Sequence, residues 1–356
     1  MPGELELEEK LSGRVYRARR ARDGRELAVR IVYPTSASMA SDFLALAEAA
    51  SRIRHPTLAS VEGFGRLTDN GCYIATEFVH GQRLDAWADG VGIPPLAQVV
   101  ELMRRLCLGL QTALRAGVVH DALNPRNIRI LGHAHASAND TGIRTPMKLL
   151  DLGVIALCKD NADDPHALRF MAPEQLVLFA RLDRPDAFRC SATMNVYSCG
   201  GLLYLLTTGG PPFPGNSASE LMGSQAGGRL VPPMRINPQI PAALNAVIVR
   251  ALSLDPSERF ESVSQLGEAL ATVSNQALAS LRPSMPAPAP REPALALGAE
   301  EDPLLDGPPT FKAERPGALL LMQESDNDNM VQPSAATTDR HEMPTLPPPS
   351  DDPSAT

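Results

Sequence analysis

The sequence predicts an α+β fold with two lobes, a small β-rich N-terminal lobe and a larger α-helical C-terminal lobe, followed by a disordered C-terminal tail. Short extended runs separated by Gly-containing turns fill the first part of the chain, which is typical of strands in a small sheet. From about residue 94 apolar residues recur at spacings of three and four, as on one face of a helix. We therefore expect an N-lobe over residues 1–79, a C-lobe over 80–282 and a tail over 283–356.

The N-lobe is expected to contain about five strands and one helix. An Asp-Gly pair beginning at Asp23 indicates a hairpin turn between the first two strands. Residues 41–55 (SDFLALAEAASRIRH) have helical spacing, with Ser41 or Asp42 as the N-cap and Pro56 as the stop. The extended runs that predict strands are 14–20, 26–33, 58–67 and 71–79.

The C-lobe is expected to be mainly helical. Residues 95–118 (PLAQVVELMRRLCLGLQTALRAGV) repeat their apolar residues at helical spacing and reach a Gly near the end. Two short strands are expected within residues 127–151, and further helices up to about residue 281.

The net charge of −8 is unevenly distributed. From Pro283 onward there are four Lys or Arg and thirteen Asp or Glu, a charge of −9, which leaves the first 282 residues at +1. The folded part therefore has no basic surplus that would indicate nucleic acid as a partner. The same stretch holds fifteen of the 33 prolines and one aromatic residue, Phe311. This composition predicts disorder. Its one apolar segment, residues 315–323, is interpreted as plain linker or as a short partner-docking helix.

The remaining composition predicts a soluble, cytoplasmic protein. The five cysteines are scattered without CxxC spacing, as expected for thiols in a reducing compartment. The acidic start MPGELELEEK lacks the basic and apolar regions of a signal peptide. The longest apolar runs are far shorter than the roughly 20 residues that a membrane helix needs, so no membrane span is expected.

Four short motifs occur in a fixed order along the chain. They are AVR at 28–30, HDALNPRN at 120–127, LLDLG at 149–153 and MAPEQL at 171–176. With this order and spacing, the chain resembles the eukaryotic-like serine/threonine protein kinases of bacteria over about residues 5–275. The rival interpretation, a small-molecule phosphotransferase of similar two-lobed shape, would not be expected to carry the segment Ala172-Pro173-Glu174.

The catalytic loop departs from the pattern of that family. The resemblance places the general base, normally Asp, at Ala122, and the usual Lys at Asn124, while His120 and Asn127 match. A methyl group cannot accept a proton, and a positioned base typically contributes about 10²- to 10⁴-fold. Asp121 is adjacent, but the spacing from His120 to Asn127 is intact, so Asp121 is not expected to substitute as the base.

The phosphate-handling positions differ as well. The resemblance places the strand Lys at Arg30 and its Glu partner at Leu46. Glu48 lies about 200° further round the helix, so we expect it on the surface. Of the glycine-rich loop only Gly13 remains, and the other two positions hold Lys10 and Glu8. Side chains at these positions would obstruct close approach of the backbone, and the Glu8 carboxylate would repel phosphate.

Part of a nucleotide site is retained. The resemblance implies ATP and Mg²⁺ as cofactors, with Asn127 and Asp151 as the metal ligands. Arg129 stands where the family has an apolar floor under the adenine, which argues against tight ATP binding. The residues that match the adenine cover are Val15 and Ala28, and those that match the lobe-connecting strand run from Glu77 to Val79.

The positions that support the fold are mostly kept. The resemblance implies a buried ion pair between Glu174 and Arg259, and packing roles for His120 and Leu152. Asn195 replaces an Asp that braces the catalytic loop.

The activation segment, residues 151–174, contains no Ser, Thr or Tyr, so it cannot be phosphorylated. Its acidic residues Asp160, Asp163 and Asp164 are interpreted as part of an exposed loop.

These departures together predict a pseudokinase, a kinase-shaped module that regulates or scaffolds a partner kinase or other signalling protein. Two alternatives stay open. One is a divergent, slow serine/threonine kinase, since phosphoryl transfer depends more on electrostatics than on the base. The other is a nucleotide sensor that binds without transfer.

Overall fold

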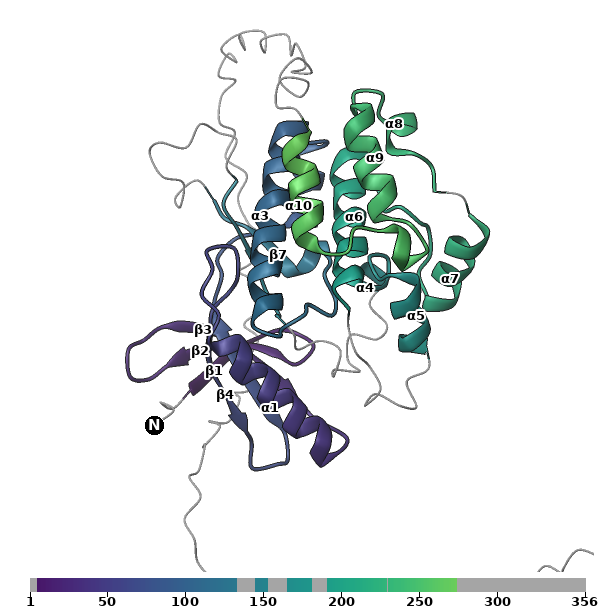
Figure 1. Ribbon diagram of the computed structural model, residues 1–356. Coiled ribbons are helices and arrows are strands. Elements are labelled where there is room, and N and C mark those ends of the chain that lie inside the picture. The colour runs from purple at the N-terminus through teal and green to yellow at the C-terminus, as the bar shows by residue number, and fades with distance from the viewer. Residues whose placement is uncertain (1–4, 133–144, 153–164, 181–190, 229, 274–356) are drawn as a thin grey trace, which may run out of the picture. The chain divides into compact units, whose positions relative to one another are not determined.

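The computed structural model describes residues 5–132, 145–152, 165–180, 191–228 and 230–273. All of them belong to the first of two units, Met1–Leu321, and the second unit, Met322–Thr356, lies outside the described residues. The predicted two-lobed α+β fold is confirmed, because a sheet with one helix is followed by a lobe of helices (Figure 1). The predicted tail over 283–356 also lies outside the described residues.

The N-lobe sheet has five antiparallel strands in the order β1-β2-β3-β5-β4. The strands are β1 (Leu5–Ser12), β2 (Val15–Arg20), β3 (Glu26–Val32), β4 (Val61–Arg66) and β5 (Cys72–Glu77). The sequence pattern does not delimit β1, because most of its residues are exposed and half of them are charged. Gly13, with φ +47°, makes the turn into β2, and Gly24, with φ +68°, forms the hairpin turn predicted between β2 and β3.

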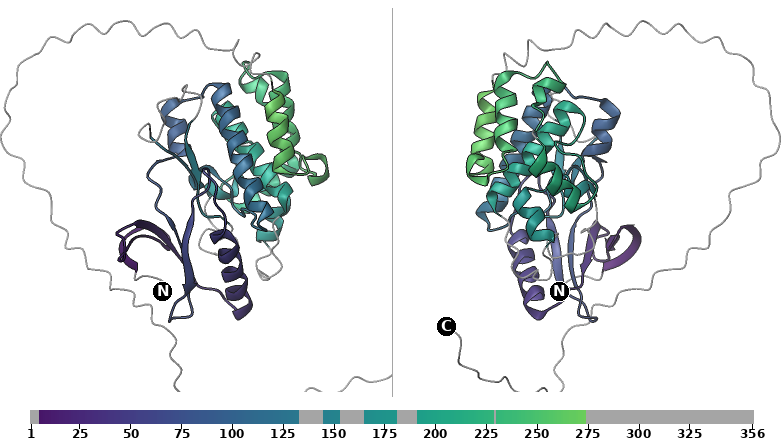
Figure 2. Two further views of the ribbon diagram at one scale, coloured as in Figure 1. Left: turned by 60° about the vertical axis from the view of Figure 1, so that its left-hand side comes forward. Right: turned by 90° about the vertical axis from the view of Figure 1, so that its right-hand side faces the viewer.

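Helix α1 (Ala37–Ser51) packs on one face of this sheet, as both views in Figure 2 show. Alternation along the strands gives each face its own apolar set. Phe43 and Ala47 of α1 lie in one core with Ile74 of β5, and Val29 lies in a second core on the opposite face. The predicted N-cap was wrong: the Ser36 side chain accepts a hydrogen bond from the Met39 amide at 3.1 Å, so the helix begins before the predicted positions.

The C-lobe is built around α6, which is buried along most of its length. Neighbouring helices α3 and α9 pack on α6, and α10 packs on α3 (Figure 1). The sequence did not predict α2, because this helix has only eight residues, too few to show a clear helical period. The helices are α2 (Leu84–Val91), α3 (Leu96–Arg115), α4 (Pro165–Leu168), α5 (Pro173–Ala180), α6 (Ala192–Thr208), α7 (Ala218–Gly227), α8 (Pro233–Ile236), α9 (Ala242–Ala251) and α10 (Val263–Thr272), with short 3-10 helices η1 (Pro125–Asn127) and η6 (Pro256–Glu258).

A second, three-stranded sheet belongs to the C-lobe and contacts the N-lobe. It has the order β6-β7-β8 and is formed by β6 (Gln82–Arg83), β7 (Ile128–Ile130) and β8 (Met147–Leu149). The latter two are the short strands predicted within 127–151. The Leu149 amide donates to Thr57 O at 2.7 Å, and the Ala59 amide donates to Leu149 O at 2.8 Å. These bonds fix β8 against the segment that leads into β4.

In the part of the chain that the structure describes, no helix is both long and apolar enough to cross a membrane. Three of the five cysteines, Cys72, Cys107 and Cys199, are buried free thiols. Cys158 and Cys190 lie outside the described residues.

Gly200 tests the close packing of α6 on α9. A Cβ atom at this position would lie 2.9 Å from Ala251 Cβ and 3.2 Å from the Ala251 carbonyl carbon. We expect Gly200→Ala to lower the free energy of unfolding by about 1–3 kcal/mol, because the backbone of α9 has to move. Gly223→Ala on α7, where a Cβ meets nothing within 4 Å, should raise it by about 0.5–1 kcal/mol. Urea unfolding measures both, and equal midpoints for the two variants would contradict this packing.

Candidate functional site

A cleft of about 480 Å³ is lined by residues from both lobes. Its volume lies in the range of small-molecule sites, roughly 300–1,000 Å³. The structure brings most of the sequence-predicted site residues together here. They are Gly13, Val15, Ala28, Arg30, Glu77, Val79, Ala122, Asn124, Asn127, Arg129 and Asp151. Leu152 lines a small adjoining cavity.

The first strand contributes less to this cleft than predicted. Glu8 and Lys10 are exposed on β1 and are not among the residues that line the cleft. The Glu8 carboxylate lies 2.9 Å from Arg19 Nε on β2. Arg19 therefore compensates the charge of Glu8 within the sheet. The predicted repulsion of phosphate by Glu8 has no support in this geometry.

Side-chain amides hold the catalytic loop by its carbonyl groups. Asn195 Nδ2 donates to His120 O at 2.6 Å, and Gln175 Nε2 donates to Asp121 O. Ala122 O accepts two bonds, from Asn124 Nδ2 at 2.8 Å and from Asn127 Nδ2 at 2.9 Å. Asn195 therefore still braces the loop, but as a donor. The backbone of the loop is fixed at three consecutive residues.

Ala122 contributes a methyl group to an apolar cluster. It is 3% exposed, and its neighbours in the cluster are Leu168, Met171, Leu176 and Leu221. Asp121 is half-buried and is not among the residues that line the cleft. The position predicted for the general base thus offers no group that can accept a proton.

Arg30 and Asp151 form a bidentate ion pair across the cleft. Arg30 Nη2 lies 2.6 Å from Asp151 Oδ2, and Arg30 Nε lies 3.3 Å from Oδ1. The side chains are only 12% and 24% exposed. Asp151 has φ +55°, a left-handed conformation that is uncommon for a residue other than Gly. Both carboxylate oxygens are used by the guanidinium.

Helix α1 offers Arg30 no carboxylate. Leu46 is half-buried against the main core, and Glu48 is exposed, as predicted, with Arg52 Nη2 at 2.5 Å from its Oε1. The two predicted metal ligands therefore differ in their availability. Asn127 uses its Nδ2 in a hydrogen bond and keeps its side-chain oxygen for a ligand, whereas the Asp151 carboxylate is bound by Arg30. In this arrangement the residues do not fit Mg²⁺, which prefers carboxylate oxygens.

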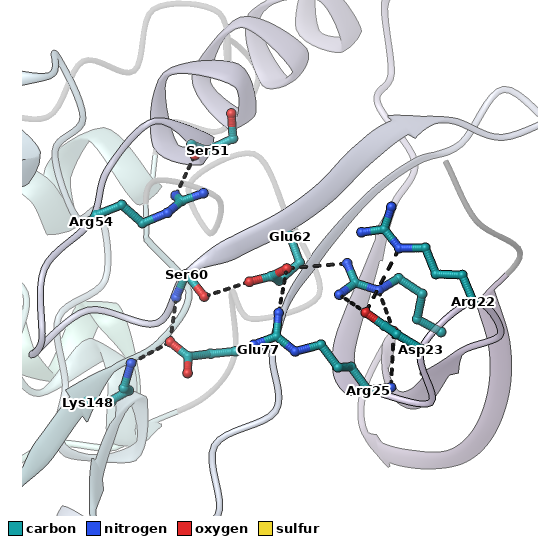
Figure 3. A network of polar contacts seen from close by, with 10 residues as sticks. Arg22, Asp23, Arg25, Ser51, Arg54, Ser60, Glu62, Glu77 and Lys148 are labelled. Carbon is teal, nitrogen blue, oxygen red and sulfur yellow. Dashed lines mark hydrogen bonds and ion pairs between the residues drawn. The ribbon is translucent and has the colours of Figure 1, made fainter. Parts of the chain in front are cut away.

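The residue that begins the lobe-connecting segment is held by a lysine that sequence reasoning missed. Lys148 Nζ lies 2.5 Å from Glu77 Oε1, which also accepts the Ser60 amide at 2.8 Å (Figure 3). Ser60 Oγ donates to Glu62 at 3.1 Å, and Arg25 reaches the same carboxylate at 3.5 Å. The only sequence signal for this role is a lone lysine between two buried apolar residues on a short strand.

The floor of the cleft carries positive charge. Arg129, on β7, is half-buried and lines the cleft, and burial lowers the pKa of its guanidinium. Arg83 and Arg126, which the sequence did not single out, line the same region. An adenine ring would rest on a guanidinium here rather than on an apolar side chain.

The predicted ion pair between Glu174 and Arg259 lies away from the cleft. Arg259 is fully buried and binds Glu174 at both oxygens, with Nη1–Oε1 at 2.6 Å and Nη2–Oε2 at 2.8 Å. Its guanidinium also stacks over the Tyr197 ring, 5.0 Å from the centroid. Residues 153–164 of the activation segment, with all three predicted acidic residues, lie outside the described residues.

Comparison with known proteins identifies the family. The family model described as "Protein kinase domain" matches residues 11–269. The chain belongs to the protein kinase family. Curated relatives of this kinase domain include serine/threonine-protein kinase pkn3 of Myxococcus xanthus, 31% identical over 69% of this chain and 45% of the relative. Another is the serine/threonine-protein kinase PknB of Mycobacterium leprae, 27% identical over 71% of this chain and 39% of the relative.

The chain spans less than half the length of these kinase relatives. Among solved structures, Rad53 residues 1–466 in complex with AMP-PNP superposes with a TM-score of 0.57 at 20% identity, covering 75% of this chain and 64% of that one. This likeness concerns the kinase fold alone. The matched kinase span includes every residue of the cleft.

We expect His120 of this kinase domain to make the stability depend on pH. It is buried, its Nε2 donates to Leu150 O at 2.9 Å, and its Nδ1 has no hydrogen-bond partner among the described residues. Burial lowers the His120 pKa below the ordinary 6.5. The unfolded chain therefore binds a proton first as pH falls through about 6.5, and the stability of the folded state declines by at most about 1.4 kcal/mol per pH unit.

Urea unfolding between about pH 5 and pH 7.5 measures this decline. His120→Gln keeps a donor but cannot titrate, so its stability should change less steeply with pH than that of the wild type. Parallel pH profiles for the two proteins would show that His120 does not cause the decline.

Proposed function

We propose that this kinase domain acts as a pseudokinase, a regulatory or scaffolding module without efficient phosphoryl transfer. The observation that carries the proposal is the Arg30–Asp151 ion pair, in a cleft whose catalytic loop has Ala122 at the base position. Transfer needs a carboxylate to hold the metal that neutralises the phosphates. Here one arginine binds that carboxylate, and a methyl replaces the proton acceptor.

The retained scaffold supports a binding role. Three consecutive carbonyls of the catalytic loop are held by side-chain amides, and Glu174 and Arg259 tie the segment after the cleft to the far helices. These contacts cost conformational entropy whether or not the site performs catalysis. They maintain a surface of fixed shape, and we propose a partner kinase or another signalling protein as its ligand.

A second candidate is a divergent, slow serine/threonine kinase. It is favoured by one observation: Asn127 and Asp151 line the same cleft, and the Asn127 amide is oriented by Ala122 O. In this candidate the Arg30–Asp151 pair opens when substrate binds. Positioning and electrostatics would then carry the reaction without a base.

A double variant separates the two candidates. Ala122→Asp combined with Arg30→Lys restores the family's residues at both positions. If the chain is a slow kinase, peptide phosphorylation should rise by about 10²-fold or more. If it is a pseudokinase, the unaltered chain shows only background incorporation in the same assay, whatever the rate of the double variant. Incorporation above background by the unaltered, folded chain would overturn the proposal.

A nucleotide sensor is a third possibility, and binding distinguishes it. A thermal-shift titration compares ATP with tripolyphosphate, with and without Mg²⁺, at millimolar ligand. A nucleotide sensor would show a saturating rise in melting temperature that is larger with ATP than with tripolyphosphate, whereas a module that does not recognise the nucleoside would show no such difference.

A further inference from the structure

A row of basic residues crosses the three-stranded sheet at the floor of the cleft. Arg83 on β6 is paired in register with Arg129 on β7, and Arg129 is paired with Lys148 on β8. Side chains directly opposite one another share a face of the sheet, and like charges in such pairs destabilise it. Two members of the row, Arg83 and Arg129, line the cleft. The fold therefore places repelling cations side by side at a concave surface.

The available carboxylates only partly compensate this charge. Lys148 is bound by Glu77. The single carboxylate of Asp85 serves two arginines, with Arg83 Nε at 3.0 Å and Arg126 Nε at 3.6 Å. The Arg129 guanidinium forms no ion pair or hydrogen bond with any of the described residues. Among the described residues, Arg129 is therefore the arginine of the cleft floor that has no carboxylate partner.

The electrostatic surroundings of Arg129 agree with this lack of a carboxylate partner. Its pKa is lowered first by burial and then by the charge of Arg83, while Asp151 and Asp85 act in the opposite direction. Both of those carboxylates are already bound by other arginines. An arginine keeps its proton at neutral pH. An anion in the cleft would supply the partner that the described residues do not.

We propose that the cleft floor binds the phosphate groups of a small polyphosphate directly through Arg83, Arg126 and Arg129, without a divalent metal. Guanidinium groups bind phosphate oxygens in bidentate fashion and need no bridging ion. The Arg30–Asp151 pair agrees with this, because it removes the carboxylate that a metal would use. The inference goes beyond the proposed function by naming the class of ligand and its site.

Isothermal titration calorimetry of the full chain tests this, with tripolyphosphate, ATP and adenosine as probes in EDTA or in Mg²⁺. We expect tripolyphosphate and ATP to bind in EDTA, adenosine to bind at least about tenfold more weakly, and Mg²⁺ to give no gain. Arg129→Gln should weaken polyphosphate binding by about tenfold or more. Arg83→Gln, at the more exposed rim, should also weaken it. The control Arg52→Gln, exposed on α1 and paired with Glu48, should bind like the wild type.

Several results would overturn the proposal: no polyphosphate binding at millimolar concentration, binding only with Mg²⁺, adenosine binding as tightly as ATP, or unchanged affinity in folded Arg129→Gln. Circular dichroism checks folding, and Arg83→Gln carries the test if Arg129→Gln does not fold. Equal affinity for tripolyphosphate and ATP would assign recognition to phosphate alone, and tighter ATP binding would add the nucleoside. Because the readout is binding, detection of phosphoryl transfer would overturn the proposed function without deciding this one.

Discussion

Glu174→Ala is expected to lower the free energy of unfolding by about 3–5 kcal/mol, the cost of leaving one member of a buried ion pair without its partner. Arg259 is fully buried, so its charge is left without a counter-ion once the carboxylate is gone. Its remaining bonds, such as the one from Nε to Ser253 O at 2.8 Å, are to neutral carbonyls. The loss is measured by urea or guanidinium unfolding followed by circular dichroism.

Glu48→Ala is the matched control for this prediction. Glu48 also forms an ion pair with an arginine, but the side chains of Arg52 and Glu48 are 74% and 56% exposed. Exposed pairs typically contribute about 0.2–1 kcal/mol, so this variant should unfold close to the wild type. Similar losses for the two variants would mean that burial of Arg259 does not set the cost.

Arg30→Met is expected to have the second largest effect, a loss of about 1.5–3 kcal/mol for two charge-assisted hydrogen bonds in a half-buried site. The variant leaves the Asp151 carboxylate without this partner, on a residue that already has φ +55°. The released carboxylate is also free to bind metal. We therefore expect Arg30→Met to bind Mn²⁺, a spectroscopic substitute for Mg²⁺, more tightly than the wild type.

Arg104→Met provides the comparison for Arg30→Met. Arg104 is paired with Glu101 one turn away on the same helix, with an N–O distance of 3.1 Å, and such a pair contributes less than about 1 kcal/mol. If Arg30→Met unfolds at the wild-type midpoint and gains no Mn²⁺ affinity, the ion pair does not control the Asp151 carboxylate.

The order of the elements could be predicted from the sequence because it depends on local spacing. Apolar alternation marks β3, and a stripe at helical spacing marks α3. The N-cap of α1 was missed because Ser36, Ser41 and Asp42 are all chemically suitable caps, and only the backbone path selects among them. Strand β6 has two residues and therefore shows no period.

The site was predictable only as a set of positions. The motifs identify Arg30 and Asp151 separately, but their pairing joins residues 121 positions apart, and local patterns carry no information about such contacts. The repulsion between Arg83 and Arg129 depends on a strand register that the sequence does not reveal. Asn195 could be placed beside the loop, whereas its role as a donor follows from the geometry of His120 O.

A single-turnover phosphorylation assay tests the central claim most directly. Purified chain in excess over radiolabelled ATP, with Mg²⁺ and a Ser/Thr peptide library, is compared with its Asp151→Ala variant. We predict the same background incorporation in both, because Ala122 has no proton acceptor and Arg30 binds the Asp151 carboxylate. Incorporation by the wild type that Asp151→Ala abolishes would contradict the account and establish an active kinase.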